Sequence, residues 1–412
     1  MIAPRSTMNY GDCMTEINWF EKSGITDTRA AQLIQTGKEL WNRAEPGFHE
    51  KDTHDYLSGL FRKMGFEIRE FEGMPGFIAA IPGAEPEIAV IADMDALPLP
   101  GDEGGRYIHS CGHHMQTTDL YGAARLLSEA SSETAARTLK KLAFIAVPAE
   151  EYIDLESREE LRKSGRIRHL SGKQELLERG IFKGFRMVVA THAAGFKEPV
   201  FISSVLGMGG FEVLHFRFTG KASHAGAQPH KGINAQNAGS LFLQACAFLR
   251  ESFDESDHIR IHPILRLQPG QSVNIIPDTA FVETYVRGAD PEAIRETVAK
   301  LKEAAEGCAR AIGAGVDIEK IPGYAPFKAD KTMHELLGKV VEEFEIPFIE
   351  EKYASPSSDM GDVSQALPSI MLGLPGVNGL FHNPGFLVTD ETAAYVLPSA
   401  VLARYLEELS ME

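Results

Sequence analysis

The chain has 412 residues, of which 43% are hydrophobic and 24% charged, and a formal net charge of -17 at pH 7. This length exceeds what one hydrophobic core usually serves, so we expect two domains. The acidic excess argues against nucleic acid or an anionic membrane as a partner. The cysteines show no paired spacing, which predicts reduced thiols. The sequence shows no signal-peptide core and no apolar run of bilayer length, so we expect a cytoplasmic protein.

The first half of the chain alternates helical and strand-like patterns. Apolar spacing predicts helices over residues 30–41, 53–64 and 120–130. Continuously apolar runs predict strands with both faces buried, at residues 77–81, 87–92, 142–147 and 187–190, and again at 368–374. Strands that alternate with helices predict a mostly parallel sheet of α/β type.

A different pattern begins near Gly209, where Leu214, Phe216 and Phe218 alternate along one face of a predicted strand. The elements that follow are a helix at 234–253, strands at 261–267 and 279–287, a helix at 291–312 capped by Asp290, and a strand at 316–321. The order β-α-β-β-α-β predicts a ferredoxin-like module inserted into the α/β domain. The predicted parts are therefore residues 1–208, 209–322 and 323–412.

The segment 151–180 is highly charged and interrupts the alternation of strands and helices. Its pattern predicts two short amphipathic helices beside the candidate site. We favour a solvated surface hairpin for this segment, with a lid over the site as the alternative interpretation.

Chemically active side chains follow the predicted buried strands. The sequence places Asp93, Asp95, Glu150, Glu151 and His192 after three such strands, His109-Ser110-Cys111-Gly112-His113-His114 before a helix, and His382 near the end. Open α/β sheets gather functional groups at the carboxyl ends of their strands, and acids massed there need compensating cations. Thiolate, imidazole and carboxylate together suit zinc or a similar first-row metal. The number of such groups predicts a two-metal site.

Eight ordered motifs, together with the inserted module, carry a resemblance to a known family. They are ADMDALP at 92–98, HSCGH at 109–113, PAEE at 148–151, His192 at its strand end, GKASHAG at 220–226, VNIIPD at 273–278, SSDMGDVS at 357–364 and FHNPGF at 381–386. The chain resembles the M20 metallopeptidases from about residue 41 to 406. The likeness is to the amidohydrolase branch, which includes aminoacylase-like, hippurate-hydrolase-like and aminobenzoyl-glutamate-hydrolase-like enzymes. The inserted module matches the dimerisation or lid domain of that family.

The resemblance implies a metal site with two divalent ions per subunit, Mn²⁺ or Zn²⁺, with Co²⁺ as a further candidate. The implied ligands are Cys111, His113, Glu151, His192 and His382. It also implies a homodimer or higher homo-oligomer that acts on a small substrate bearing a carboxylate.

The resemblance assigns roles to five further residues. Glu150 would be the general base that takes a proton from a metal-activated water, and Asp95 would orient a metal ligand. His224 of the partner subunit would stabilise the oxyanion. Asn274 and Arg287 would hold the carboxylate of the substrate.

Two departures from the family pattern lie next to the predicted site. The branch usually reads CGHDGHT, whereas this chain reads CGHHMQTT, so that His114 and Gln116 replace an acid and a histidine. The charged segment after Glu151 is also longer than usual. Both changes predict an unusual substrate at a standard metal centre.

The sequence favours hydrolysis of the amide of an N-acyl amino acid or aryl amide, and three alternatives stay open. The same centre could hydrolytically deaminate an aromatic amine, or the chain could be a non-catalytic metal-binding homologue. Cys111 could instead be a nucleophile with His113 as its base. Residues two apart in a tight turn rarely align thiol and imidazole, which argues against this thiol amidase.

Overall fold

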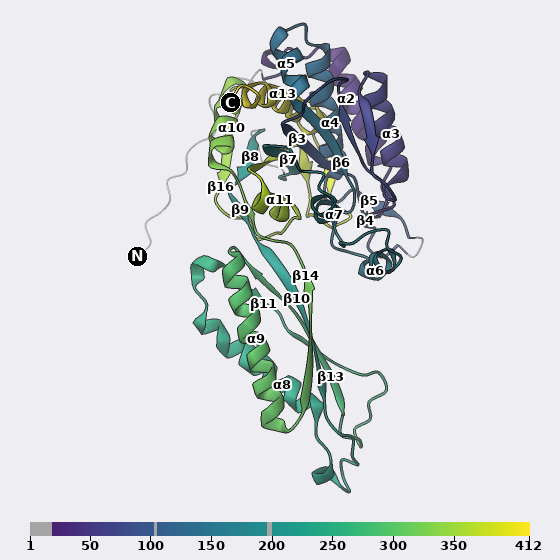
Figure 1. The fold of residues 1–412 in the computed structure, drawn as a ribbon, viewed down its shortest axis with the longest axis vertical. Helices are drawn as coiled ribbons and strands as arrows, with labels where there is room; N and C mark the ends of the chain where they lie inside the picture. The colour runs from purple at the N-terminus through teal and green to yellow at the C-terminus, as the bar shows by residue number, and fades with distance from the viewer. Residues whose placement is uncertain (1–18, 103–104, 196–199) are drawn as a thin grey trace.

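The computed structural model describes residues 19–102, 105–195 and 200–412. The chain forms a larger α/β body and an elongated second unit that projects from one end of it (Figure 1). Among the described residues, no helix is both long enough and apolar enough to cross a membrane.

An eight-stranded sheet runs through the larger body in the order β1-β2-β6-β3-β7-β17-β8-β16. These strands are β1 (Glu67–Glu70), β2 (Phe77–Ala80), β3 (Ile88–Asp93), β6 (Leu142–Val147), β7 (Met187–Ala193), β8 (Ile202–Val205), β16 (Phe348–Glu351) and β17 (Ser369–Leu374). The four central strands, β6, β3, β7 and β17, are parallel, and antiparallel pairs occur only toward the edges. The prediction of a mostly parallel α/β sheet is confirmed.

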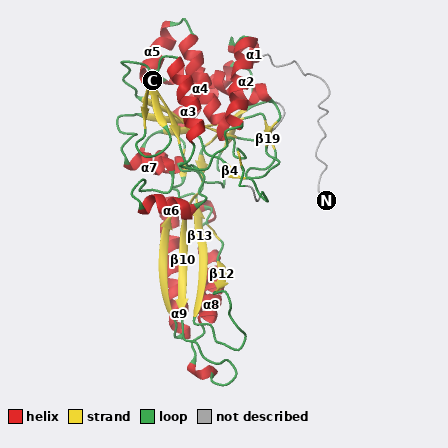
Figure 2. Ribbon diagram, turned by 90° about the vertical axis from the view of Figure 1, so that its right-hand side faces the viewer, coloured by secondary structure: helices red, strands yellow, loops and turns green. Residues whose placement is uncertain are grey.

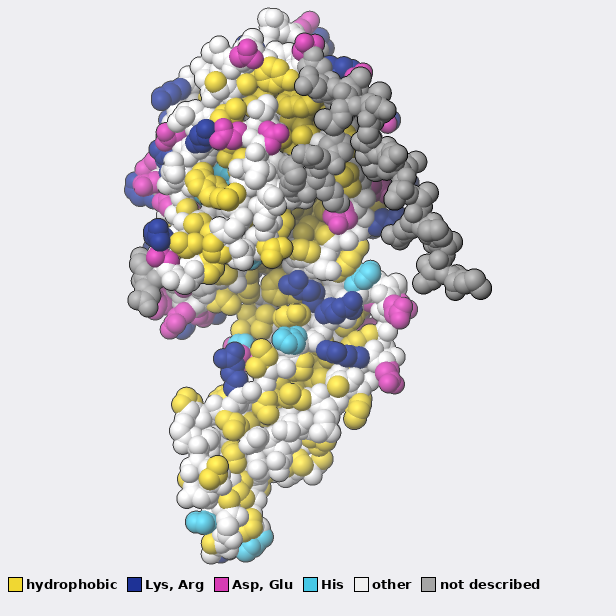
Figure 3. Space-filling view, turned by 180° about the vertical axis from the view of Figure 1, so that it is seen from behind, with side chains coloured by type: hydrophobic (Ala, Val, Ile, Leu, Met, Phe, Trp, Pro, Cys, Tyr) yellow, Lys and Arg dark blue, Asp and Glu magenta, His cyan; other side chains and the backbone are white. Residues whose placement is uncertain are grey.

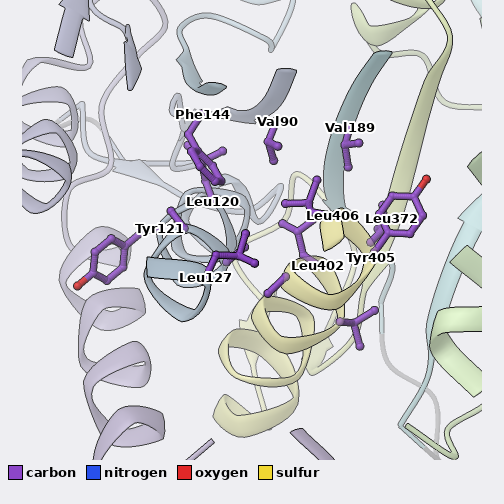
Figure 4. Packing of buried hydrophobic residues seen from close by; sticks show 14 of the residues in the cluster. Val90, Leu120, Tyr121, Leu127, Phe144, Val189, Leu372, Leu402, Tyr405 and Leu406 are labelled. Carbon is purple, nitrogen blue, oxygen red and sulfur yellow. The ribbon is translucent and has the colours of Figure 1, made fainter. Parts of the chain in front are cut away.

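Helices cover both faces of this sheet because its strands alternate two sets of apolar side chains. Val90 and Phe144 point to one face, where they pack with Leu120 and Leu402 (Figure 4). That face is covered by α2 (Asp27–Trp41), α3 (Lys51–Lys63), α4 (His113–Glu129), α5 (Glu133–Lys141), α10 (Lys331–Glu343) and α13 (Leu397–Leu409). Residues of α7 (Gly172–Glu178) and α11 (Met360–Ala366) pack against the other face.

Short elements complete the larger body. They are the helices α1 (Trp19–Ser23), α6 (Leu155–Lys163) and α12 (Glu391–Tyr395), and the ladders β4 (Leu97–Pro98) with β5 (Tyr107–Ile108), β9 (Gly207–Met208) with β15 (Phe327–Lys328), and β18 (Val377–Asn378) with β19 (Leu387–Val388).

The second unit is an antiparallel sheet with two helices on one face (Figure 2). Its elements are β10 (Gly210–Thr219), α8 (Ala235–Leu249), β11 (Arg260–Ile261), β12 (Ile264–Leu267), β13 (Thr279–Gly288), α9 (Pro291–Ile312) and β14 (Gly315–Pro322). Leu214, Phe216 and Phe218 share one face of β10 as predicted, and they are buried against the two helices. The predicted strand at 261–267 is divided into β11 and β12 by Pro263, which has no N–H for a ladder.

The two units are joined by a narrow neck in which β10 leaves the larger body and β14 returns to it as neighbouring strands. Glycines stand at both crossings. A Cβ at Gly210 would lie 2.4 Å from the nitrogen of Pro326, and one at Gly323 would lie 2.2 Å from the oxygen of Phe211. Figure 3 shows Lys and Arg side chains grouped around this neck, with apolar and uncharged side chains over much of the unit below it.

Candidate metal centre

The predicted site residues of the larger body meet at the carboxyl ends of the central strands. Asp95 follows β3, Glu150 and Glu151 follow β6, and His192 lies near the end of β7. These three strands are parallel neighbours, so their ends share one edge of the sheet.

Cys111 and His113 reach this edge from the turn that begins α4. The turn passes through Gly112 at φ 84°, a left-handed conformation that favours glycine. A Cβ at Gly112 would lie 2.6 Å from the Cβ of Ala193 in β7, so the turn can approach the strand only without a side chain. This close approach sets the thiol and the imidazole beside His192.

The five predicted ligand residues form one cluster of donor atoms. The Sγ of Cys111 lies 3.5 Å from Nε2 of His192, and Nε2 of His113 lies 4.0 Å from Oε1 of Glu151. The same carboxylate oxygen is 3.4 Å from Nε2 of His382. Three overlapping groups have all their donor atoms within 4.8 Å of one another: Cys111, His113 and His192; Cys111, Glu151 and His382; and His113, Glu150 and Glu151.

The chemistry of this cluster fits bound cations. Nε2 of His113 and Oε1 of Glu151 are buried with no hydrogen-bond partner among the described residues, which costs free energy unless another ligand engages them. Burial, with Glu151 beside it, raises the pKa of the Cys111 thiol. A neighbouring cation would hold that thiol as a thiolate.

Asp95 connects two parts of the cluster. One carboxylate oxygen is 3.0 Å from Nδ1 of His113, and the other accepts a hydrogen bond of 3.0 Å from the backbone N–H of Glu151. Burial acts to raise the pKa of Asp95, but the hydrogen bond and charge of His113 outweigh it and lower that pKa. A carboxylate at Nδ1 leaves Nε2 of His113 free to face the other donors.

Glu150 lies beside the candidate ligands His113 and Glu151. Its side chain is buried, with Oε2 3.9 Å from Nε2 of His113. Burial and the adjacent Glu151 raise its pKa well above the ordinary range. The preceding Ala149 has φ 57°, and the hydroxyl of Tyr324 donates to the main-chain oxygen of Glu150. These contacts fix the backbone from which the Glu150 carboxylate projects.

The remaining predicted site residues do not lie together at the cluster. They are His224, Asn274 and Arg287, all in the second unit. His224 is exposed beyond the end of β10, and Asn274 lies beside it, since the Asn274 oxygen accepts from Ala225 N at 2.8 Å. Arg287 lies at the other end of the sheet, next to the larger body, where Nη1 donates to the Ser355 oxygen at 3.1 Å. Strands β10 and β13 pair over ten residues, so their ends are about 30 Å apart.

The two substituted residues of the CGHHMQTT motif, His114 and Gln116, pack around the cluster. His114 is buried with its ring edge-on to Trp41, at a centroid distance of 4.8 Å. Gln116 accepts a hydrogen bond of 3.0 Å from the backbone N–H of Asp93 at the end of β3. Neither residue is in a group of candidate metal ligands among the described residues.

The preference for a solvated surface hairpin at 151–180 is wrong for part of that segment. The two predicted helices are present as α6 and α7, but Arg158 is 2% exposed and Lys173 is 0% exposed. The Nζ of Lys173 contacts Asp93 and lies 2.6 Å from Oδ1 of Asp359, beside the cluster. No local signal marks Lys173 as buried, because the two carboxylates around its ammonium lie 80 and 186 residues away along the chain.

Thiol, imidazole and carboxylate donors that meet at the carboxyl edge of an α/β sheet are typical of metal-dependent hydrolases. In this cluster Cys111, His113 and Glu151 are buried, whereas His382 is exposed. The chain belongs to the peptidase family M20/M25/M40, whose model matches residues 89–408. Members of this family hydrolyse C–N bonds, and the prediction of such an enzyme is confirmed.

Curated relatives and solved structures agree with this assignment. The chain is 25% identical over 400 residues to an N-acetylcysteine deacetylase of Bacillus subtilis, covering 92% of this chain and 96% of the relative. It is 23% identical over 314 residues to an N-acyl-L-amino acid amidohydrolase of Geobacillus stearothermophilus, covering 73% and 79%. A Bacillus subtilis structure described as a dinuclear metal binding peptidase of the M20 family has the same fold, with TM-score 0.74, 21% identity and coverage of 94% and 99%.

Proposed function

We propose that this protein is a binuclear metal amidohydrolase that cleaves the amide of an N-acyl amino acid or a related aryl amide. The position of Glu150 carries the proposal, because this buried carboxylate borders the candidate ligands His113 and Glu151. The names of the deacetylase and amidohydrolase relatives support the substrate class.

Two divalent cations, Mn²⁺ or Zn²⁺, with Co²⁺ as a further candidate, fit the donor set. We assign the ligands to Cys111, His113, Glu151, His192 and His382, whose donor atoms fall into overlapping groups. Such cations, when bound, lower the pKa of a water molecule and polarise the amide carbonyl.

In the proposed reaction a water oxygen forms a bond to the carbonyl carbon, and the C–N bond then breaks. Glu150 accepts the proton of the attacking water and passes it to the leaving nitrogen, so the products are a carboxylic acid and an amine. Asp95 supports this chemistry by orienting the imidazole of His113.

We infer that the second unit is a ferredoxin-like dimerisation and lid domain over residues 209–322, between catalytic parts 1–208 and 323–412. The sheet order β11-β13-β10-β14 and the two helices on one face support this inference. Because His224 and Asn274 lie at the distal end, they are assigned to the site of a partner subunit. Arg287, beside the larger body, is assigned to the carboxylate of its own subunit's substrate.

The proposal is tested by metal analysis of the purified protein and by assays on N-acyl amino acids and aryl amides with and without chelator. We expect about two metals per chain and chelator-sensitive release of acid and amine. Release of ammonia and a phenol instead would establish aromatic deamination at the same centre. Amide cleavage that survives complete metal removal would contradict the metal mechanism and favour Cys111 as a nucleophile.

Replacement of Cys111 should lower metal content. Cys111→Ala removes a donor that is shared by two of the candidate ligand groups, so we expect fewer than two metals per chain after dialysis, measured by elemental analysis. The matched control is Cys246→Ala, which removes a buried thiol in the core of the second unit and should leave metal content unchanged. Unchanged stoichiometry in Cys111→Ala would remove this residue from the ligand set.

A further inference from the structure

The segment 155–178 carries two buried cations into the larger body. Arg158 comes from α6 and Lys173 from α7, and both are almost completely buried. Figure 2 shows α6 at the end of the larger body that faces the second unit. Arg162, on the same helix as Arg158, is exposed and paired with Glu159. Because long cationic side chains are rarely buried without a partner, the partners of Arg158 and Lys173 indicate their role.

Lys173 joins two aspartates from separate elements. Its ammonium contacts the carboxylate of Asp93 at the end of β3 and that of Asp359 at the start of α11. The second oxygen of Asp359 accepts from Ser171 and from the backbone N–H of Lys173 at 3.1 Å. Burial opposes the charge of Lys173, but the two carboxylates outweigh it and raise its pKa.

This group of three charges borders the proposed base. The backbone N–H of Gly172, which precedes Lys173, donates at 3.1 Å to the oxygen of Ala149, which precedes Glu150. After burial and Glu151, the carboxylates of Asp359 and Asp93 also raise the pKa of Glu150, and the ammonium of Lys173 lowers it. Without the ammonium, three carboxylates would lie close together in a region of low dielectric, where their repulsion is strong. Lys173 therefore keeps the ends of β3 and α11 together beside Glu150.

Arg158 lies beside the carboxylate that supports the proposed metal ligand His113, much as Lys173 lies beside the proposed base. Its Nη2 lies 4.0 Å from Oδ2 of Asp95, the carboxylate that engages Nδ1 of His113. Nη1 donates to the Leu170 oxygen at 2.8 Å, and the guanidinium lies 5.6 Å from the ring centroid of Phe48. Nη2 makes no hydrogen bond among the described residues, so Arg158 acts on the Asp95 carboxylate through its positive charge.

We propose that the segment 155–178 is a positioning element of the metal centre. Arg158 positions the ligand His113 through the carboxylate between them, and Lys173 positions the base Glu150 through the two aspartates that it binds. The part that concerns Lys173 rests on the proposed function. Neither cation touches the reacting atoms, so both are positioning residues.

The first test measures metal affinity and needs no substrate. Apo-protein carrying Arg158→Met is titrated with Zn²⁺ in competition with a chromophoric chelator. We expect affinity to fall at least about tenfold, as when an outer-shell partner of a ligand histidine is lost. Arg162→Met removes an exposed cation from the same helix and should keep wild-type affinity.

Two further variants separate positioning from folding. Arg158→Lys retains the charge and should recover part of the lost Zn²⁺ affinity. Tyr405→Phe removes a buried hydroxyl that donates to the Met333 oxygen in the distant helical layer. It should lower Tm with no effect on Zn²⁺ affinity. Wild-type affinity in folded Arg158→Met would overturn the proposal.

The second test concerns turnover. Lys173→Met combined with Asp359→Asn removes one charge of each sign, so no extra charge is left buried. We expect kcat to fall at least about tenfold, with KM within about threefold of wild type and zinc content unchanged. Wild-type kcat in this folded double variant would refute the role of Lys173. If the wild-type protein cleaves no amide, the proposed function fails, while the zinc affinities of the Arg158 variants still decide the positioning role.

Discussion

Glu150→Gln is expected to abolish nearly all turnover while the protein keeps its metals. The amide of glutamine has the shape of the carboxylate but cannot accept a proton, so the transfer from water to the leaving nitrogen is lost. General-base catalysis contributes about 10²–10⁴-fold, and we expect kcat to fall by about this factor. The measurement is steady-state kinetics on the best N-acyl substrate, with elemental analysis of the same preparation.

The matched control for this substitution is Glu160→Gln, an exposed position on α6 that should retain wild-type kinetics. Metal content distinguishes the role of Glu150 from that of its neighbour. Because Glu151 is the proposed ligand, Glu151→Gln should lose metal as well as activity. Full activity of Glu150→Gln would exclude this residue as the base.

Mixing two inactive variants is expected to restore activity if each site is built from two subunits. His224→Ala removes the proposed oxyanion donor, a change that costs about 10²–10³-fold in kcat for such groups. In a mixed dimer with Glu150→Gln, one site carries both lesions and the other carries neither. Random exchange between equal amounts of the two variants should therefore restore about a quarter of wild-type activity in a symmetric dimer.

Subunit exchange in this experiment is verified by a tag on one variant and recovery of the untagged chain with it. The position of His224 about 30 Å along the second unit from the neck is the reason for the expected result. Verified exchange without any recovery of activity would show that His224 does not complete the site of a partner. The Glu150→Gln variant alone, taken through the same exchange procedure, gives the activity expected without complementation.

The sequence predicted the elements of the fold well because their patterns are local. The strand predicted at 142–147 has the bounds of β6, and the Asp290 side chain caps α9 by accepting hydrogen bonds from Glu292 N and Ala293 N. The end of helix 234–253 was less accurate, since α8 stops at Leu249 and a 3-10 turn follows. Apolar spacing extends past Leu249 and gives no signal for that change.

The supporting charges of the site could not be predicted in the same way. Charged residues at 151–180 indicated a solvated surface, and nothing local distinguishes Lys173 from the exposed Arg168. Lys173 is buried because two carboxylates from β3 and α11, 80 and 186 residues away along the chain, converge on its ammonium. Such long-range pairing depends on the tertiary fold and leaves little trace in sequence periodicity.

Because the second unit is long and joined to the larger body by a narrow neck, a small rotation at the neck moves its far end by a large distance. A rotation of about 10° at the neck would displace the far end of β10, about 30 Å away, by about 5 Å. That displacement is larger than the length of a hydrogen bond, so the proposed contact of His224 with a partner's site would depend on small changes in the neck angle. The close packing at Gly210 and Gly323 limits that angle, and these two glycines therefore set the geometric tolerance of groups far from them.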